Sequence, residues 1–154
     1  EFAFSVPGHM KLAGGETKAI YKTAVRELLG DELTYRKKQM FTVFNHLIQN
    51  ALAFCPPGEE EIIIKAREIK NARQGDQVEI TVSDNGPGID PDALENIFEP
   101  FFTTKKEGYG VGLGLSTVYG IIERHNGTIS VESQPGEGAI FMLALPVSRA
   151  PVNE

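Results

Sequence analysis

The spacing of apolar residues in the first third of the chain indicates two helices. Within Thr17–Leu29 apolar side chains recur at every third or fourth position, which is the period of an amphipathic helix, and Gly30 ends the run. Asp31 is a candidate N-cap for a second helix that we expect to extend to about Phe54, because Pro56-Pro57-Gly58 cannot continue it. The expected buried stripe of the second helix is Leu33, Met40, Phe44, Leu47, Ile48 and Ala51.

Strand patterns dominate the remainder of the chain. Ile62–Ile69 and Val78–Val82 are rich in β-branched residues, and the polar segment Asn71–Asp76 between them is typical of the turn of an antiparallel hairpin. Thr128–Ser133 and Ala139–Pro146 form a second expected pair around a glycine-rich turn. Between the two pairs we expect a short helix near Asp92–Ile97, an irregular, mobile loop over residues 99–112, and a helix over Leu113–Arg124.

Together these elements predict an α+β two-layer sandwich, with helices on one face of a mixed, mostly antiparallel sheet. The length of 154 residues suits one domain with one core. We expect that domain at residues 17–147, after a tag, linker or irregular segment at 1–16 and before a polar tail at 148–154. No apolar run approaches the roughly 18 to 20 residues that span a bilayer, so no membrane contact by this domain is expected.

Composition narrows the function classes by exclusion. The formal net charge of −6 argues against nucleic-acid binding, because nucleic-acid-binding proteins normally present a basic face. It does not exclude an anionic ligand, because backbone amides can bind phosphate without lysines. The single cysteine, Cys55, cannot form an internal disulfide and fits a reducing compartment, so a cytoplasmic location is expected.

A polar segment interrupts the helix that is expected to end near Phe54. Asn disfavours helix interiors because its side chain competes for backbone hydrogen bonds, yet Asn45 and Asn50 both lie there. His46 and Asn50 are four residues apart, about 40° around a helix, so both can contact one ligand. Asn45 faces another direction. A solvated polar stripe is an equally good explanation of this segment alone.

Two glycine-bearing segments are candidate binding loops. Residues 84–89, Asp-Asn-Gly-Pro-Gly-Ile, directly follow an expected strand, and the glycines allow a ligand to approach a carboxylate that can accept a hydrogen bond from an amine. Residues 110–115, Gly-Val-Gly-Leu-Gly-Leu, open an expected helix, whose N-terminal N–H groups favour phosphate. The second segment is neither a P-loop nor a strand-flanked GxGxxG motif. Each segment alone is a weak signal.

The order and spacing of these three segments resemble the N, G1 and G2 boxes of the GHKL ATPases. That superfamily includes histidine kinases, gyrase-type topoisomerases, mismatch-repair ATPases and a heat-shock chaperone. Residues 96–105, NIFEPFFTTK, look like the F box of histidine kinases, and FFTTK with GLGLSTVYGII is similar to the nitrogen-regulation and oxygen-sensing subfamily. The resemblance covers roughly residues 33–147. It implies a Bergerat-type fold and the ATP-binding catalytic domain of a two-component sensor histidine kinase.

The resemblance also implies a role for each matching residue. Asn50 would bind Mg²⁺ that bridges the ATP phosphates, and His46 would hold the water shell of the metal or orient the phosphate, unless it is structural. Asp84 would accept the adenine amino group, and Lys105 could reach the terminal phosphates. The expected nucleotide-binding residues are Asn50, Phe54, Asp84, Gly86, Gly88, Ile89, Thr103, Thr104, Lys105, Gly110, Val111, Gly112, Leu113, Gly114 and Leu115. Phe98, Phe101 and Phe102 are either core aromatics or contacts to a phosphoacceptor domain.

Two positions depart from the pattern of the relatives. Ala53 stands where many have a phosphate-contacting Lys, and Ala139 follows Gly138 where many have Thr, so modest nucleotide affinity is expected. The three histidines, His9, His46 and His125, all lack the helical His-Glu/Asp context of a phosphoacceptor. A histidine on a separate domain is therefore expected to receive the phosphoryl group.

The resemblance implies two partners: a phosphoacceptor and dimerisation domain of the same kinase, and the receiver domain of a response regulator. We expect the isolated domain to be a monomer. A membrane anchor elsewhere in the parent protein is compatible with a cytoplasmic location of this domain. Two alternatives stay open. An anti-sigma-type serine kinase has the same ATP fold, and a degenerate module would act through nucleotide or protein contacts without catalysis. Nucleotide binding and phosphotransfer to an added domain distinguish the three.

Overall fold

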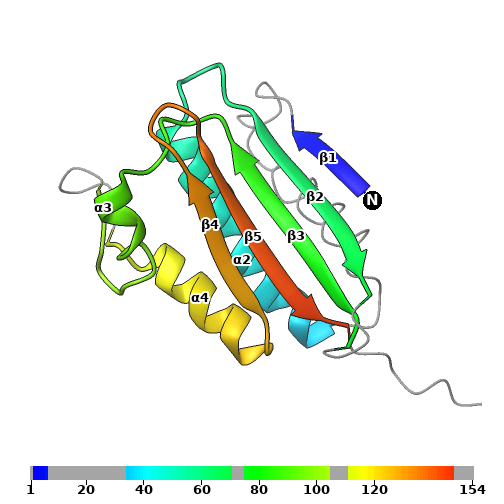
Figure 1. The fold of residues 1–154 in the computed structure, drawn as a ribbon. Helices are drawn as coiled ribbons and strands as arrows, with labels where there is room; N and C mark the ends of the chain where they lie inside the picture. The colour runs from blue at the N-terminus through cyan, green and yellow to red at the C-terminus, as the bar shows by residue number, and fades with distance from the viewer. Residues whose placement is uncertain (1, 7–33, 71–74, 105–110, 148–154) are drawn as a thin grey trace, which may run out of the picture.

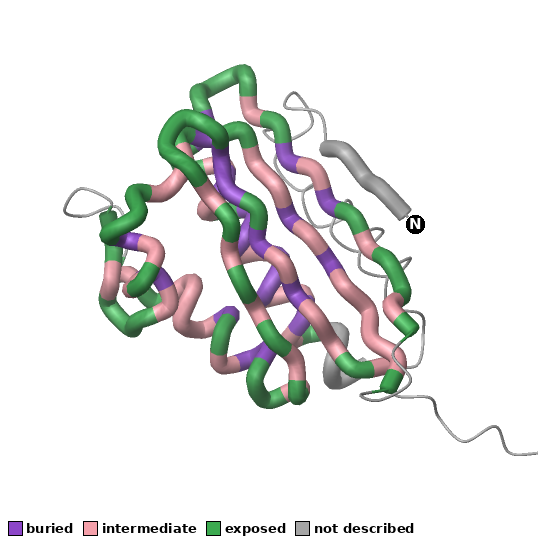
Figure 2. The backbone as a smooth tube through the Cα atoms, in the orientation of Figure 1, coloured by how far each residue is buried: buried purple, intermediate pink, exposed green. Residues whose placement is uncertain are grey.

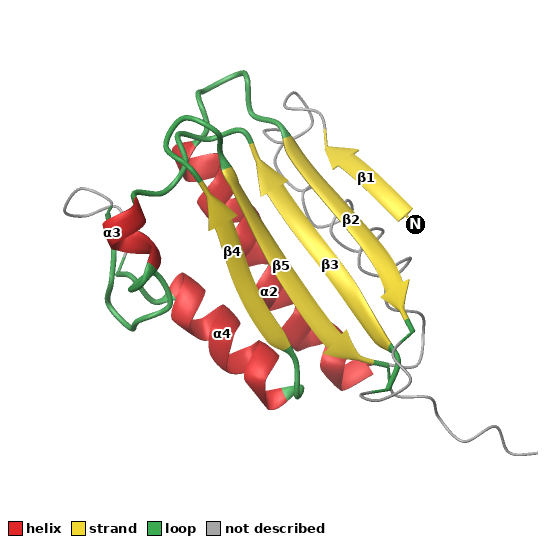
Figure 3. Cartoon of the chain, viewed as in Figure 1, coloured by secondary structure: helices red, strands yellow, loops and turns green. Residues whose placement is uncertain are grey.

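The computed structural model describes residues 2–6, 34–70, 75–104 and 111–147. Its strands form one five-stranded sheet in the order β1-β2-β3-β5-β4, and helices α2 and α4 lie against one face of it (Figures 1 and 3). The elements are β1 (Phe2–Val6), α2 (Thr34–Phe54), β2 (Ile62–Ile69), β3 (Gln77–Asp84), α3 (Pro91–Leu94), α4 (Gly114–Arg124), β4 (Thr128–Ser133) and β5 (Ala139–Pro146). The expected α+β two-layer sandwich is confirmed.

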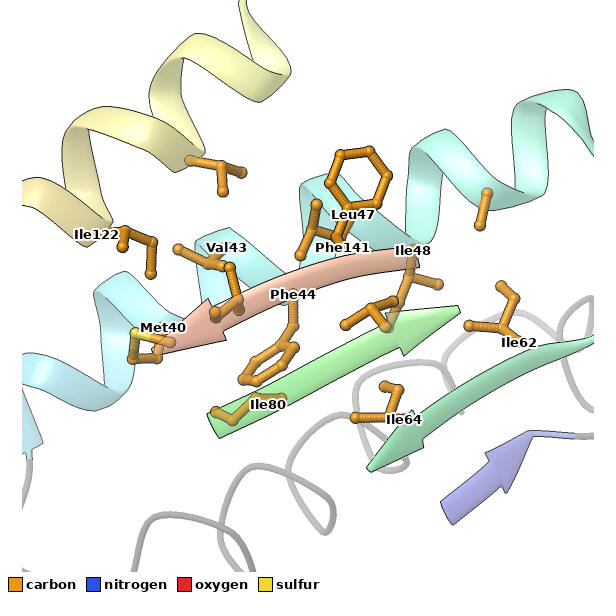
Figure 4. Close-up of a cluster of buried hydrophobic side chains, with 14 of the residues drawn as sticks. Met40, Val43, Phe44, Leu47, Ile48, Ile62, Ile64, Ile80, Ile122 and Phe141 are labelled. Atoms are coloured by element: carbon orange, nitrogen blue, oxygen red, sulfur yellow. The ribbon is translucent and has the colours of Figure 1, made fainter. Parts of the chain in front are cut away.

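Helix α2 forms because its apolar residues recur at helical spacing and can all face the sheet. The buried residues on α2 are Met40, Val43, Phe44, Leu47, Ile48 and Ala51. They include every described member of the expected stripe, together with Val43, which the sequence analysis missed; Leu33 lies outside the described residues. Figure 4 shows Phe44 of α2 directed toward the sheet, next to Ile80 of β3.

The sheet contributes the other half of the core through the alternating pattern of its strands. Ile80 of β3 pairs with Leu143 of β5, and both are fully buried. Ile62 and Ile64 of β2 continue the same face (Figure 4). Figure 2 shows that buried positions are concentrated in α2, α4 and the central strands. On the opposite face, the Arg67 guanidinium pairs with the Glu79 carboxylate at 2.6 Å.

Helix α4 packs beside α2 and ends at a backbone reversal. Its Val118, Ile121 and Ile122 are buried. The His125 ring nitrogen Nδ1 lies 2.8 Å from the Ile121 carbonyl oxygen, so this histidine caps the helix end. Asn126 then adopts a φ of 55° and leads into β4.

The structure corrects three details of the expected fold. Residues Phe2–Val6 form strand β1 on the sheet edge, where a tag, linker or irregular segment was expected. All four strand pairings are antiparallel in the described part of the chain, whereas a mixed sheet was expected. The short helix spans only Pro91–Leu94. The expected helix at 17–29, the N-cap at Asp31, most of the turn after β2 (residues 71–74) and the tail at 148–154 lie outside the described residues.

Candidate functional site

A cleft of about 640 Å³ opens between α2, the loop after β3 and the residues that lead into α4. Residues far apart in sequence meet there: the middle of α2, residues 87–90 after β3, residues 102–104, residues 111–115, and the first residues of β5. The three segments that the sequence singled out therefore surround one cavity.

The α2 side of the cleft carries the polar pair. His46 and Asn50 are both half-buried and line the cavity, as expected from their spacing. The imidazole of His46 faces the start of α4, because a Cβ atom built on Gly114 would lie 3.4 Å from His46 Nδ1. Phe54 lies one turn after Asn50, and its ring is 40% exposed at the cavity. Helix α2 thus presents an imidazole, an amide and an aromatic face to one ligand.

Asp84, the last residue of β3, lines the cleft with a half-buried carboxylate. Its Oδ1 accepts a hydrogen bond from the Gly86 N–H at 2.9 Å, and the Ala139 N–H also donates to the carboxylate. Burial raises the pKa of Asp84 above its ordinary value, and these two hydrogen bonds oppose that shift. The group is a fixed hydrogen-bond acceptor aimed at an uncharged donor such as an amine.

The loop after Asp84 is held rigidly from both sides. The Asn85 side chain accepts from the Glu61 N–H at 2.8 Å and donates to the Glu59 carbonyl at 2.7 Å. Gly88 has a φ of 74°, and a Cβ there would lie 2.0 Å from the Gln134 carbonyl oxygen. Only glycine permits this approach. The sequence did not single out the role of Asn85, although an Asn directly after a strand is typical of such side-chain to backbone bridges.

The residues before α4 form the other end of the cleft. Gly112 has a φ of 72° and packs so closely on Phe101 that a Cβ would lie 2.5 Å from the Phe101 carbonyl carbon. The Phe101 N–H donates to the Gly112 carbonyl at 2.9 Å. Leu113, at the N-cap position of α4, makes no side-chain capping hydrogen bond. The first-turn N–H groups of α4 lack intrahelical partners, so this end favours an anion.

Most of the expected nucleotide-binding residues share this one cavity. Those that line it are Asn50, Phe54, Asp84, Gly88, Ile89, Thr103, Thr104, Val111, Gly112, Leu113, Gly114 and Leu115. Gly86 is buried beside the carboxylate rather than at the cavity wall: a Cβ there would lie 2.8 Å from Asp84 Oδ1. Lys105 and Gly110 lie outside the described residues.

The cleft also contains residues that the sequence analysis did not propose as binding residues. They are Gln49, Ala51, Pro87, Asp90, Ile97, Phe102, Ala139 and Phe141. Ile97 and Phe141 are buried core residues that also form the cavity wall. Their apolar pattern does not differ from that of other core residues, so no sequence signal could have separated them. Gln49 stands next to Asn50 and could have been found from its place beside the polar pair.

Comparison with known proteins identifies the family of the chain. The sequence model of the family described as "Histidine kinase-, DNA gyrase B-, and HSP90-like ATPase" matches residues 35–149, which contain the whole cleft. The chain belongs to this ATPase family. An asparagine synthase model matches residues 1–55 only, a segment that lacks the Asp84 loop and the start of α4.

Two relatives illustrate the similarity to curated proteins. The chain is 43% identical over 122 residues to the alginate biosynthesis sensor protein KinB of Pseudomonas aeruginosa, covering 77% of this chain and 20% of KinB. It is 53% identical over 111 residues to the sensor kinase CckA of Brucella abortus, covering 66% of this chain and 12% of CckA. The chain thus spans a fifth or less of the length of these relatives.

Solved structures support the same fold. The catalytic domain of histidine kinase ThkA superposes with a TM-score of 0.62 at 24% identity, covering 95% of this chain and 96% of that one. The mycobacterial sensor histidine kinase MprB superposes with a TM-score of 0.61 at 23% identity, covering 85% of this chain and 93% of that one.

Among the described helices, none combines the length and the apolar character that a membrane crossing requires.

Proposed function

We propose that this ATPase-family chain is the catalytic domain of a sensor histidine kinase, which binds Mg-ATP and donates the γ-phosphoryl group to a histidine on a separate domain. The observation that carries the proposal is the meeting of Asp84, Asn50 and the start of α4 in one cleft. An acceptor at one end and an anion-favouring helix terminus at the other match the two ends of a purine nucleotide. The relatives CckA, named a sensor kinase, and KinB, named a sensor protein, support the choice within the family.

Asp84 recognises the purine in this proposal. Its carboxylate accepts a hydrogen bond from the exocyclic amine of adenine, while Phe54 and Ile89 provide apolar walls for the ring. Guanine presents a carbonyl oxygen at the equivalent position, which an ionised carboxylate repels. The site therefore selects ATP over GTP, because bound GTP would leave the guanine carbonyl oxygen and the Asp84 carboxylate, both hydrogen-bond acceptors, facing each other.

Asn50 is the proposed Mg²⁺ ligand at the phosphate end. The described residues contain no group of three or more His, Cys, Asp or Glu side chains that could hold a metal. A neutral amide oxygen nevertheless fits Mg²⁺, which commonly takes one or two protein ligands and completes its shell with water and substrate phosphates. When bound, the ion neutralises phosphate charge. His46, whose ring lies beside Gly114, and the N–H groups at the start of α4 orient the phosphate chain together.

The phosphoacceptor histidine belongs to another domain in this proposal. His46 lies inside the cleft and His125 caps α4, so neither described histidine is placed as an exposed acceptor. At the cleft, Val111 and Leu113 are 70% and 42% exposed, and Phe101, hydrogen-bonded to Gly112, is 71% exposed. These apolar side chains offer a docking surface for the acceptor domain.

In the complex of the two domains, an imidazole nitrogen attacks the γ-phosphorus as the bond to the ADP oxygen breaks, and catalysis comes from positioning and charge neutralisation. The receiver domain of a response regulator then takes the phosphoryl group. We infer a cytoplasmic location for this domain from its use of ATP and from the Cys55 thiol, which is not in a disulfide, and a monomeric state for the isolated chain.

Phosphotransfer tests the proposal. The chain is mixed with the phosphoacceptor domain of its own parent kinase and radiolabelled ATP. We expect acid-labile label on that domain, which Asn50→Ala abolishes and Ala53→Ser, a change at an exposed position of the same helix, leaves intact. Label on serine would favour the anti-sigma-type kinase. Nucleotide binding without any transfer would indicate a binding module and contradict the proposal.

A further inference from the structure

Ser133, the last residue of β4, connects two backbone segments through one hydroxyl group. Its Oγ accepts a hydrogen bond from the Ile89 N–H at 2.9 Å. The same hydroxyl donates to the Gly138 carbonyl oxygen at 2.6 Å. Ile89 lines the cleft and Gly138 is buried behind it, whereas Ser133 itself is half-buried and does not line the cavity. The hydroxyl therefore joins the loop after β3 (residues 85–90, here called the purine loop) to the turn between β4 and β5 (residues 134–138).

The peptide between Gly138 and Ala139 extends this connection to Asp84. Its carbonyl group accepts the hydrogen bond from Ser133, and its N–H group donates to the Asp84 carboxylate. Because a trans peptide is planar, its C=O and N–H groups point in opposite directions and rotate together. A hydrogen-bonded chain thus runs from the Ile89 N–H through the serine hydroxyl and this peptide to Asp84, and its members strengthen one another.

Close packing makes this chain of hydrogen bonds sensitive to small movements. Gly138 adopts a φ of 73°, and a Cβ there would lie 2.0 Å from the Asp84 carbonyl oxygen. The Gly136 N–H also donates to the Pro87 carbonyl at 2.7 Å. The turn and the purine loop therefore touch along their backbones. The Ser133 side chain contacts both segments at once through its two hydrogen bonds.

We propose that Ser133 is a positioning residue for the purine end of the cleft, because its hydroxyl fixes the Gly138–Ala139 peptide and Ile89 and thereby aims the Asp84 carboxylate at the adenine amine. The inference rests on the proposed adenine nucleotide site. Without the hydroxyl, the Ile89 N–H and the Gly138 carbonyl lose their shared partner, and the peptide that donates to Asp84 is free to rotate.

The matched pair Ser133→Thr and Ser133→Val tests the hydroxyl directly, since the two side chains share their shape and strand preference and differ in the hydroxyl. Calorimetric titration with ADP and with a non-hydrolysable ATP analogue gives the affinities. We expect Thr to bind like the wild type and Val to bind roughly ten-fold more weakly, the cost of leaving half-buried polar groups unpaired. The factor is the same for both nucleotides because the phosphate end is untouched. Ser130→Val, at an exposed position of β4, is the control and leaves affinity unchanged.

A pH series separates positioning from a general loss of structure. A weaker hydrogen bond from Ala139 removes part of what lowers the pKa of Asp84, so that pKa moves further upward in Ser133→Val. Adenine binding then fails at a higher pH in Ser133→Val than in Ser133→Thr as the solution is acidified. The cleft also contains the ionisable side chains of His46 and Asp90, and Cys55 Sγ lies near Gly86. The chemical shift of the Asp84 carboxyl carbon, followed by NMR across the same pH series in both nucleotide-free variants, assigns the difference to this carboxylate.

Two results overturn the inference. If Ser133→Val binds within two-fold of Ser133→Thr, the hydroxyl does not position the site. If Thr binds as weakly as Val while both melt like the wild type, the effect comes from side-chain volume. Failure of the wild-type chain to bind adenine nucleotides is a different outcome, because it removes the proposed function itself.

Discussion

Gly138 offers a sharp test of how the β4–β5 turn supports the cleft. An alanine at this position has two separate costs. Its φ of 73° is left-handed, which costs roughly 1–2 kcal/mol for a residue with a Cβ. The new Cβ would also lie 2.0 Å from the Asp84 carbonyl oxygen, which is backbone and cannot rotate away. Forcing the strands apart adds about 1–3 kcal/mol, for a total of about 2–5 kcal/mol.

Gly136 in the same turn is the matched control. Its φ is 86°, but a Cβ there meets no atom within 4 Å, so Gly136→Ala carries only the backbone cost. Urea denaturation of the two nucleotide-free variants measures the difference, which we expect to be about 1–3 kcal/mol with Gly138→Ala the less stable. Gly138→Ala should also weaken adenine binding, whereas Gly136→Ala should not. Equal stability of the two variants, with equal affinity, would refute the reasoning.

Three further changes probe the core, the carboxylate and the phosphate end. Leu143→Ala, at a fully buried position, should lower the unfolding free energy by about 2–5 kcal/mol. Ile140→Ala, on the outer face of the same strand, should lower it by less than about 1 kcal/mol. Equal losses for the two variants in urea denaturation would contradict the assignment of the core. Burial raises the pKa of Asp84, so its contribution to stability is present at acidic pH and is lost as the pH rises through the folded pKa. The melting temperature of the wild type should therefore fall relative to that of Asp84→Asn as the pH rises above the ordinary pKa of an aspartate, and parallel pH profiles would count against this reasoning. Ala53 is exposed and lies three residues after Asn50 in α2. Ala53→Lys should strengthen binding of the ATP analogue several-fold, because the ammonium group can contact phosphate, and should leave adenosine binding unchanged. An equal gain for adenosine in calorimetry would contradict this prediction.

Local sequence patterns predicted the strands whose residues bury one face. Three strands have the same bounds in the structure as the sequence predicts: Ile62–Ile69, Thr128–Ser133 and Ala139–Pro146. Each is an apolar or alternating run that is bounded by turn residues. Strand β1 was missed. It has only five residues, and its place is set by antiparallel pairing with β2, some sixty positions later in the chain. Pairing over such a separation leaves no local signal.

Some residues of the site could also be predicted from the sequence, and others could not. Asn50 and Asp84 could be named from the sequence because the order and spacing of their segments resemble the boxes of the GHKL ATPases, and both residues line the cleft. Gly86 was assigned to the purine, whereas the structure has it beneath the carboxylate, a distinction that depends on which way a turn folds. The hydrogen bonds of Ser133 were beyond the sequence, because a serine at the end of an amphipathic strand resembles many solvent-exposed ones.

The central claim is that the cleft binds an adenine nucleotide through Asp84. Calorimetric titration of the whole chain with ADP and GDP, with and without Mg²⁺, beside Asp84→Asn, tests it most directly. We expect saturable binding of ADP over GDP, strengthened by Mg²⁺ and lost in Asp84→Asn. Absence of binding at millimolar ADP, or ADP binding that Asp84→Asn leaves unchanged, would contradict the account.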